Sequence, residues 1–210
     1  MEQTTDLLQR CYPSRRAELK RTILRTALAC FNQHGIEATT IEQVRAQCDA
    51  SVGAIYHHFG NKEGLVAALF FTALDDQAAL REAYLAKADT LEQVVHALVH
   101  SYVDWVSAQP DWARFQFLAR FAVSKGPLQD ELLARNRTRN QQLRERLSVH
   151  GAELLQDLPK ELIASLIVGP AENYCRAWLS GRVSTSPSAY RDALAAAVWR
   201  ALGGLESPAH

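Results

Sequence analysis

The sequence lacks the patterns that mark most enzymes, membrane proteins and secreted proteins. No GxSxG, HExxH, P-loop or glycine-rich dinucleotide fingerprint occurs in its 210 residues, which argues against the corresponding hydrolytic and nucleotide chemistries. Its longest near-apolar stretch, Leu65 to Leu74, is far shorter than the roughly 20 residues that cross a bilayer. The polar start MEQTTDLLQR has no signal-peptide pattern. We therefore expect a cytoplasmic protein that is not an enzyme and uses no cofactor.

Cysteine pairs are also missing. The four cysteines are scattered without a CxxC spacing, namely Cys11, Cys30, Cys48 and Cys175. This distribution argues against zinc ribbons and thioredoxin-like redox motifs. Cys30 and Cys48 are predicted to lie on apolar helix faces, where a free thiol acts as a small hydrophobe. A redox role for Cys11 or Cys175 stays open.

One group of polar residues has the spacing of a metal site but too few members. His96, His100 and Asp104 recur every four residues and therefore share one face of a helix, where they could ligate zinc. No fourth candidate ligand stands at a defined spacing. We interpret the histidines as polar groups of an interface or a pocket and predict no metal site.

The chain has no excess of either charge, with 23 basic and 23 acidic side chains. That balance argues against a protein that coats DNA through bulk charge, although a protein that reads DNA needs only one basic face. Basic residues do gather in one early run: Arg10, Arg15, Arg16, Lys20, Arg21 and Arg25. The run would supply non-specific attraction to phosphates, unless it is an ordinary solvated face.

Helical periodicity is present along most of the chain, and alternating β-branched segments are absent. Short breaks with capping and turn residues separate the periodic segments, which predicts an all-α fold of about nine helices. After a frayed start, Ser14 is expected to cap a long first helix, and Gly35 stands where a left-handed helix end would need it. The apolar stripe of this helix is Leu19, Ile23, Ala27, Cys30 and Phe31.

Two short helices are predicted next, joined by a turn. Thr40 and Gln43 form a capping box for the first, Ser51 caps the second at Val52 to His58, and Asn61 caps the long helix that follows. Their inward-facing side chains would be Ile41, Val44, Cys48, Ile55 and Phe59. A long helix followed by two short ones is typical of a helix-turn-helix head, whose second short helix enters the DNA major groove.

Longer helices complete the predicted fold. Thr90 and Gln93 indicate a second capping box, which opens a helix that ends near Gln109. Four further helices are expected to begin at or near a proline, namely at Trp112 after Pro110, at Pro127, at Pro159 and at Ser186-Pro187. Pro170 lies inside the penultimate helix and is expected to kink or break it.

The segment GIEATTIEQVRAQCDASVGAIYHHFGNKEGLVAAL closely resembles the DNA-binding head of the TetR family of repressors. The positions that carry the likeness are Ser51, Gly53, Ile55, Tyr56, His58, Phe59, Asn61, Lys62, Glu63 and Leu65. The resemblance implies a DNA-binding domain over residues 16–76, with its helix-turn-helix near 39–58, and a ligand-sensing and dimerisation domain over 77–205.

The resemblance also implies residue roles in DNA binding. Thr40, Tyr56 and Lys62 would bind phosphates, a role that hydroxyls, ammonium groups and helix N-termini suit. The outward residues of the second short helix would face bases or the adjoining backbone. The complete predicted set is Arg15, Arg16, Thr40, Ser51, Val52, Ala54, Tyr56, His57, His58 and Lys62.

Three positions in this head need a separate interpretation. Arg45 stands where the family usually has a small residue and is expected to extend outward along the DNA-facing edge. Asp49 stands where the family usually has glycine, and aspartate tolerates a left-handed turn better than most residues. Gly53 is interpreted as the mark of a close helix crossing.

The C-terminal half suggests an interface and a pocket. The penultimate helix is apolar on nearly every side, and the last is rich in alanine, so the pair could form a four-helix interface with a second copy. The alternative is that both helices are buried within a monomer. The predicted ligand pocket is His100, Trp105, Trp112, Phe115, Phe121, Asn173, Tyr174 and Trp178. An aromatic stripe can equally be plain core.

Together these features predict a homodimeric regulator that binds a palindromic operator in double-stranded DNA. The resemblance favours a repressor released by a small-molecule inducer of unknown identity. Two alternatives stay open. One is a ligand-dependent activator of the same fold, and the other is a helical adaptor that binds only protein.

Overall fold

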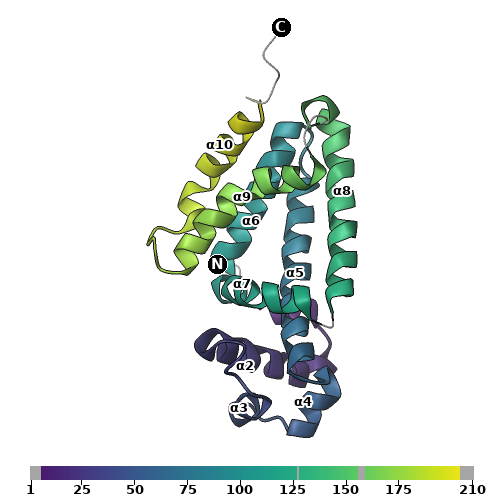
Figure 1. Cartoon of the computed structure of the whole chain (residues 1–210), viewed down its shortest axis with the longest axis vertical. Coiled ribbons are helices and arrows are strands. Elements are labelled where there is room, and N and C mark those ends of the chain that lie inside the picture. Colours follow the sequence, from purple (N-terminus) through teal and green to yellow (C-terminus); the bar gives the residue numbers. More distant parts are fainter. Residues whose placement is uncertain (1–5, 127, 156–158, 204–210) are drawn as a thin grey trace. The chain divides into compact units, whose positions relative to one another are not determined.

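The computed structural model describes residues 6–126, 128–155 and 159–203, and these ranges are helical and contain no strand (Figure 1). The predicted all-α class is confirmed. The helices are α1 (Leu7–Cys11), η1 (Arg15–Ala17), α2 (Glu18–His34), α3 (Ile41–Ala46), α4 (Val52–Phe59), α5 (Lys62–Leu85), α6 (Leu91–Ala108), α7 (Pro110–Lys125), α8 (Gln129–Leu155), α9 (Lys160–Leu179), η2 (Pro187–Tyr190) and α10 (Arg191–Gly203). The short helices η1 and η2 are 3-10 helices.

The described chain divides into two compact units. The first holds the described residues up to Asp76 and those between Asp111 and Ala134, and the second holds the described residues of 77–110 and those from Arg135 on. The division therefore falls inside α5, at the first residue of α7 and inside α8. None of the described helices combines the length and the apolar character that a membrane span requires.

The head of the first unit forms because α2 buries one apolar stripe and packs against α3, which in turn packs against α4. Ile23, Ala27, Cys30 and Phe31 are fully buried, as their helical spacing predicts, whereas Leu19 at the end of that stripe is 37% exposed. The helix ends at Gly35, whose φ of 83° lies in the region that favours glycine.

The predicted caps define the two short helices. Thr40 and Gln43 make both bonds of the capping box at the start of α3. The Ser51 side chain accepts a hydrogen bond of 3.0 Å from the Ala54 amide at the start of α4, and Asn61 accepts one of 2.7 Å from Gly64 at the start of α5. These bonds satisfy amides that would otherwise lack partners at helix N-termini.

Several local expectations for the first unit are wrong. Ser14 caps η1, and α2 begins after Ala17 without a side-chain cap. Cys48 lies beyond the end of α3 and is half-buried. Asp49 does not adopt a left-handed conformation, because glycines alone have positive φ among the described residues. The expected frayed start is a helix, α1, with Leu7 and Leu8 buried, and the ten α-helices of the described chain agree with the expected number of about nine.

The second unit is built around α6, which packs against α9, α10 and η2. The Thr90 cap is confirmed, but Gln93 accepts from the Asp89 amide, so the reciprocal bond of a capping box is absent from this described turn. Pro127 lies outside the described residues. The helix α9 runs through Pro170 without a break. Its buried face is Ile163, Ile167, Ala171, Cys175, Ala177 and Leu179.

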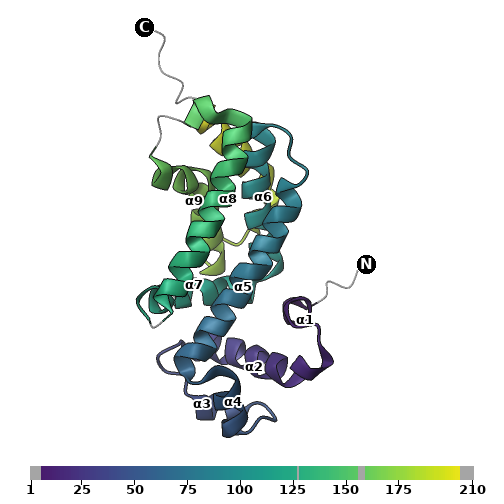
Figure 2. The same ribbon diagram turned by 90° about the vertical axis from the view of Figure 1, so that its right-hand side faces the viewer.

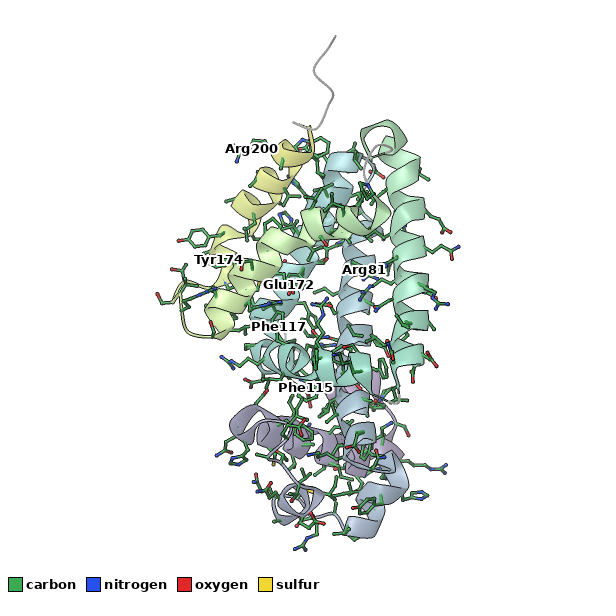
Figure 3. The ribbon with its side chains drawn as sticks, viewed as in Figure 1. Arg81, Phe115, Phe117, Glu172, Tyr174 and Arg200 are labelled. Carbon is green, nitrogen blue, oxygen red and sulfur yellow. The ribbon has the colours of Figure 1, made fainter. Side chains whose placement is uncertain are left out.

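One aromatic contact closes the core of the first unit. The ring of Phe115 on α7 is directed toward α2 (Figure 3) and stacks on Phe31, with centroids 5.8 Å apart. Phe115 is fully buried, whereas Phe121 on the same helix is 68% exposed, with the Lys125 ammonium 4.3 Å from its ring centroid.

The two phenylalanines give a matched test of this packing. We expect Phe115→Ala to lower the free energy of unfolding by about 3–5 kcal/mol, since a buried ring leaves a cavity. Phe121→Ala should cost less than about 1 kcal/mol, the range of an exposed cation–π contact. Urea denaturation of both variants at one protein concentration measures the difference. Equal losses would contradict the described core.

Candidate nucleic-acid interface

Helix α4 has one buried face and one exposed face. Ile55 is 1% exposed and Phe59 is buried within the head, which confirms their predicted inward position. On the other face Tyr56 is 46% exposed. The remaining residues of the predicted recognition surface are exposed or half-buried, namely Ser51, Val52, Ala54, His57 and His58. The described head therefore offers a compact polar surface on a helix narrow enough for a major groove.

The hydroxyls that cap the two short helices can still donate a hydrogen bond. Thr40 accepts a bond of 3.2 Å from the Gln43 amide, and Ser51 accepts from Ala54. A hydroxyl has one proton and two acceptor lone pairs, so each O–H can still donate to a phosphate oxygen. Both residues are exposed. Their capping and phosphate-binding roles are therefore chemically compatible.

The junction between α4 and α5 involves two glycines that the sequence reasoning passed over. Gly60 has a φ of 76°, a conformation that side chains disfavour. A Cβ on Gly64 would lie 2.0 Å from the carbonyl oxygen of Phe59, which leaves no room for any side chain. The end of α4 thus sits directly on the first turn of α5. In the sequence, Gly60 and Gly64 could have been noticed only because they lie among the positions that resemble the TetR family.

Lys62 holds this junction to the loop between α2 and α3. Its Nζ donates to the carbonyl oxygens of Ile36 and Glu37, each at 3.1 Å. An ammonium group has three protons, so one donor remains after these two bonds. The predicted phosphate contact of Lys62 therefore stays a prediction, alongside a structural role that sequence reasoning missed.

Gly53 does not mark a close helix crossing. A Cβ built on it would meet only the Ser51 side chain, at 3.8 Å, which is an ordinary contact. The residue is exposed on the same helix as Tyr56. The missing side chain leaves the α4 backbone accessible from outside the head.

Most of the early basic run has partners inside the protein. Arg10 pairs with Asp76, Arg25 pairs with Asp6, and Lys20 lies 4.2 Å from the ring centroid of Tyr12. Arg21 is buried, and its guanidinium donates to two backbone carbonyls. These four residues therefore have structural roles that the sequence did not indicate, and their attraction for DNA stays a prediction. Arg15 and Arg16, by contrast, lie exposed on η1.

The histidines of the second unit belong to a polar cluster on α6. The rings of His96 and His100 are 5.6 Å apart, and His100 Nε2 lies 3.1 Å from an Asp192 carboxylate oxygen. Burial and the Arg191 charge lower the pKa of His100. Asp104 does not join the histidines, because it accepts from the Arg191 guanidinium at 2.8 Å and from a tyrosine hydroxyl. Among the described residues, no three potential ligands are placed to hold a metal ion.

The structure distributes the predicted pocket residues over both units. Trp112, Phe115 and Phe121 lie in the first unit, and the others lie in the second. Trp105 is 2% exposed, so it belongs to the core around α6. The Tyr174 hydroxyl donates to the Thr185 carbonyl, as its place on α9 in Figure 3 allows. Asn173 is exposed and Trp178 is half-buried. The ligand pocket stays a prediction.

The first unit contains a separate small cavity. It lies beside Lys62, with Val66 of α5 and Val123 of α7 among its walls, and its volume is about 130 Å³. Cavities that hold drug-sized ligands are usually about 300–1,000 Å³. This cavity is therefore too small to stand for the predicted pocket.

Comparison with known proteins supports the interpretation of this head. Residues 23–69 match the family model described as "Bacterial regulatory proteins, tetR family". The HTH-type transcriptional repressor AcnR of Corynebacterium glutamicum is 34% identical over 92 residues, which are 43% of this chain and 46% of that repressor. The head of this chain is therefore similar to the DNA-binding domain of TetR-family regulators. The aligned segment spans about half the length of the repressor.

Solved structures of TetR-family proteins share the fold across both units. A TetR family transcription regulator from Marinobacter aquaeolei matches with a TM-score of 0.74 and 17% identity, over 89% of this chain and 96% of that one. FadR of Bacillus subtilis, solved in complex with stearoyl-CoA, matches with a TM-score of 0.65 and 14% identity, over 91% of this chain and 100% of that one. At such low identity the likeness concerns the fold alone.

Two cysteines of this protein are poorly suited to thiolate chemistry. Burial raises the pKa of Cys11 to about 11 and that of Cys175 to about 12. Since the thiolate is the reactive form, iodoacetamide at pH 8 should leave both unmodified in the folded protein. Mass spectrometry of the same peptides after labelling in urea provides the control. Labelling of the folded protein at the rate seen in urea would show that these thiols are not protected.

Proposed function

We propose that this protein is a sequence-specific DNA-binding transcriptional regulator that acts in the cytoplasm as a repressor. The observation that supports the proposal best is the outward surface of α4, a capped helix with Tyr56 and His57 exposed and Ile55 buried in the head. In a helix-turn-helix protein this helix enters the major groove. The names of the curated relatives as transcriptional repressors agree with the proposal.

We assign the polar residues of the head to two roles. Thr40, Tyr56 and Lys62 bind phosphates and set the position of the head on the duplex, together with Arg15 and Arg16. The residues at the start and middle of α4 read base edges, where small apolar side chains contact thymine methyls and an imidazole donates to guanine. Those residues are Ser51, Val52, Ala54, His57 and His58.

The protein acts as a homodimer that uses α9 and α10. Three alanines on α10 are exposed at positions four residues apart, namely Ala193, Ala197 and Ala201, and therefore share one face. Leu162 on α9 is 41% exposed. Two copies of this helix pair would form a four-helix interface. A two-fold dimer would place two heads on the half-sites of a palindrome, about 34–36 Å apart or a multiple of that.

A small molecule regulates the hold on DNA. The predicted pocket residues of the second unit lie on α6 and α9, and FadR of Bacillus subtilis, of similar fold, was solved with stearoyl-CoA. A ligand that binds one arrangement of α5 better than another would shift the population away from the DNA-binding form. A ligand that instead binds the DNA-binding form better would make the protein a ligand-dependent activator. Measuring whether the ligand lowers or raises operator affinity distinguishes the two.

The phosphate role of Tyr56 can be tested on operator DNA selected from a random-sequence pool. We expect Tyr56→Phe to raise Kd by at least about tenfold, because a hydrogen bond to a charged group contributes about 1.5 kcal/mol or more. Fluorescence anisotropy of labelled operator measures Kd.

Tyr190→Phe is the matched control for this measurement, because Tyr190 is 44% exposed but lies in the second unit. It should bind as the wild type does. If the selection yields no sequence that the wild type prefers over scrambled DNA, the protein is an adaptor and the proposed function fails.

A substitution at Gly53 should change DNA binding and stability in opposite directions. We expect Gly53→Ala to stabilise the head by about 0.5–1 kcal/mol, because alanine loses less backbone entropy in a helix and its Cβ has room. The same variant should bind operator more weakly, since the added methyl stands where the α4 backbone meets the duplex. Thermal unfolding and anisotropy measure the two effects. Equal or tighter DNA binding would rule out close approach at this residue.

A further inference from the structure

The N-terminal segment before α2 is attached to the head at many points. We infer that residues 6–17, here called the N-terminal strap, hold Arg15 and Arg16 in position for DNA and link them mechanically to α5. Arg10, Tyr12, Thr72 and Asp76 are then positioning residues for DNA binding. The inference rests on the proposed function, because it concerns how two of its phosphate-binding residues are presented.

The main attachment is the ion pair between α1 and α5. The Arg10 guanidinium donates to both carboxylate oxygens of Asp76, through Nε and one terminal nitrogen, each at 2.9 Å. Asp76 is buried, with 8% of its surface exposed, and its hydrogen bond raises the pKa of Arg10. A two-point contact of this kind fixes the orientation of both side chains as well as their distance.

Apolar and neutral polar contacts support this pair. Leu7 and Leu8 of α1 are each 1% exposed, so the short helix is held by burial as well as by charge. One turn before Asp76, the Thr72 hydroxyl lies 2.8 Å from the Tyr12 hydroxyl. Thr72 is itself buried. Figure 2 shows α1 beside α2, and Arg10 of α1 also contacts Asp76 of α5. A five-residue helix would not persist alone in water, so these contacts keep it folded.

The strap is also bound to α2, on the side of the two exposed arginines. The buried Arg21 guanidinium donates to the carbonyl oxygens of Tyr12 and Ser14, and Lys20 covers the Tyr12 ring. These residues bracket the turn that leads directly into Arg15 and Arg16. The basic residues of the early run are therefore divided by task, since the buried and paired ones fix the strap and the exposed pair faces outward.

Helix α5 connects this strap with the recognition helix. Asn61 caps the first turn of α5 directly after α4, and Lys62 in that turn binds the loop that follows α2. Asp76 joins the strap to the same helix 14 residues after Lys62. At 1.5 Å per residue the two attachments are about 21 Å apart along one rigid helix. A rotation or shift of α5 must displace both attachments together. Beyond Asp76 the helix continues into the second unit, where the proposed effector acts.

The test is a double-mutant cycle on operator binding by the full-length protein, read by fluorescence anisotropy over a range of salt concentrations. We expect Asp76→Asn to weaken binding by about five- to tenfold and to reduce the salt dependence by up to about two phosphate contacts. Removing a negative charge should by itself strengthen binding to DNA. Weaker binding by Asp76→Asn therefore cannot be explained by the change in net charge. Asp75→Asn, the same charge change at the exposed neighbour, is the matched control and should not weaken binding.

The cycle distinguishes positioning from general destabilisation. In a protein that already carries Arg15→Ala and Arg16→Ala, Asp76→Asn should cause no further loss, because no arginines remain to be positioned. An equal loss in both backgrounds would overturn the inference. Should Asp76→Asn unfold the head, as thermal unfolding would show, Tyr12→Phe replaces it, with a smaller loss expected and the same dependence on the two arginines.

The outcomes also separate this inference from the proposed function. A wild type that prefers no operator sequence means that the function itself is wrong. Specific binding that is weakened by Arg15→Ala with Arg16→Ala, yet unchanged by both Asp76→Asn and Tyr12→Phe, leaves the function standing and refutes the strap.

Discussion

The position of the recognition helix depends on the junction at which α4 ends and α5 begins. The carbonyl oxygen of Phe59 occupies the space in which a side chain on Gly64 would stand, Asn61 caps the new helix, and Lys62 binds the loop that follows α2. Backbone, cap and ammonium group thus join three segments at one place. A helix that sends Tyr56 outward and Ile55 inward needs such a support, because eight residues cannot hold an orientation alone.

Local chemistry made much of the head predictable from sequence. Capping needs a hydroxyl or amide at one position and an amide donor within three residues, so Thr40, Ser51 and Asn61 identified the starts of three helices. Helical spacing identified the buried stripe of α2 for the same reason. What these rules could not give is the partner of a charged side chain. Arg15 and Arg21 are alike in sequence, yet one is exposed and the other is buried against backbone carbonyls.

Long-range partners account for the other errors. Leu7 and Leu8 belong to a helix too short to show a period, and it is held by their burial and by the contact of Arg10 with Asp76, far along the chain. The assignment of Trp105 and Phe115 to the ligand pocket stays a prediction, because aromatic clustering indicates burial without saying what each ring packs against. Phe115 lies against Phe31 in one unit and Trp105 in the core of the other. The predicted close helix crossing at Gly53 is wrong because glycine occurs both where another backbone is close and where the surface is open, and the sequence does not distinguish the two.

The exposed alanines of α10 would prevent this chain from forming mixed dimers with homologous subunits. Ala193, Ala197 and Ala201 present methyl groups to solvent, so a partner helix laid on them can come to nearly the shortest distance that two helical backbones permit. A homologue with a bulkier residue at any one of these positions would be held away by steric exclusion. Recognition between identical chains would then be enforced by shape, at no cost in buried charge. Several regulators of the same architecture could then be present in one cell without forming heterodimers.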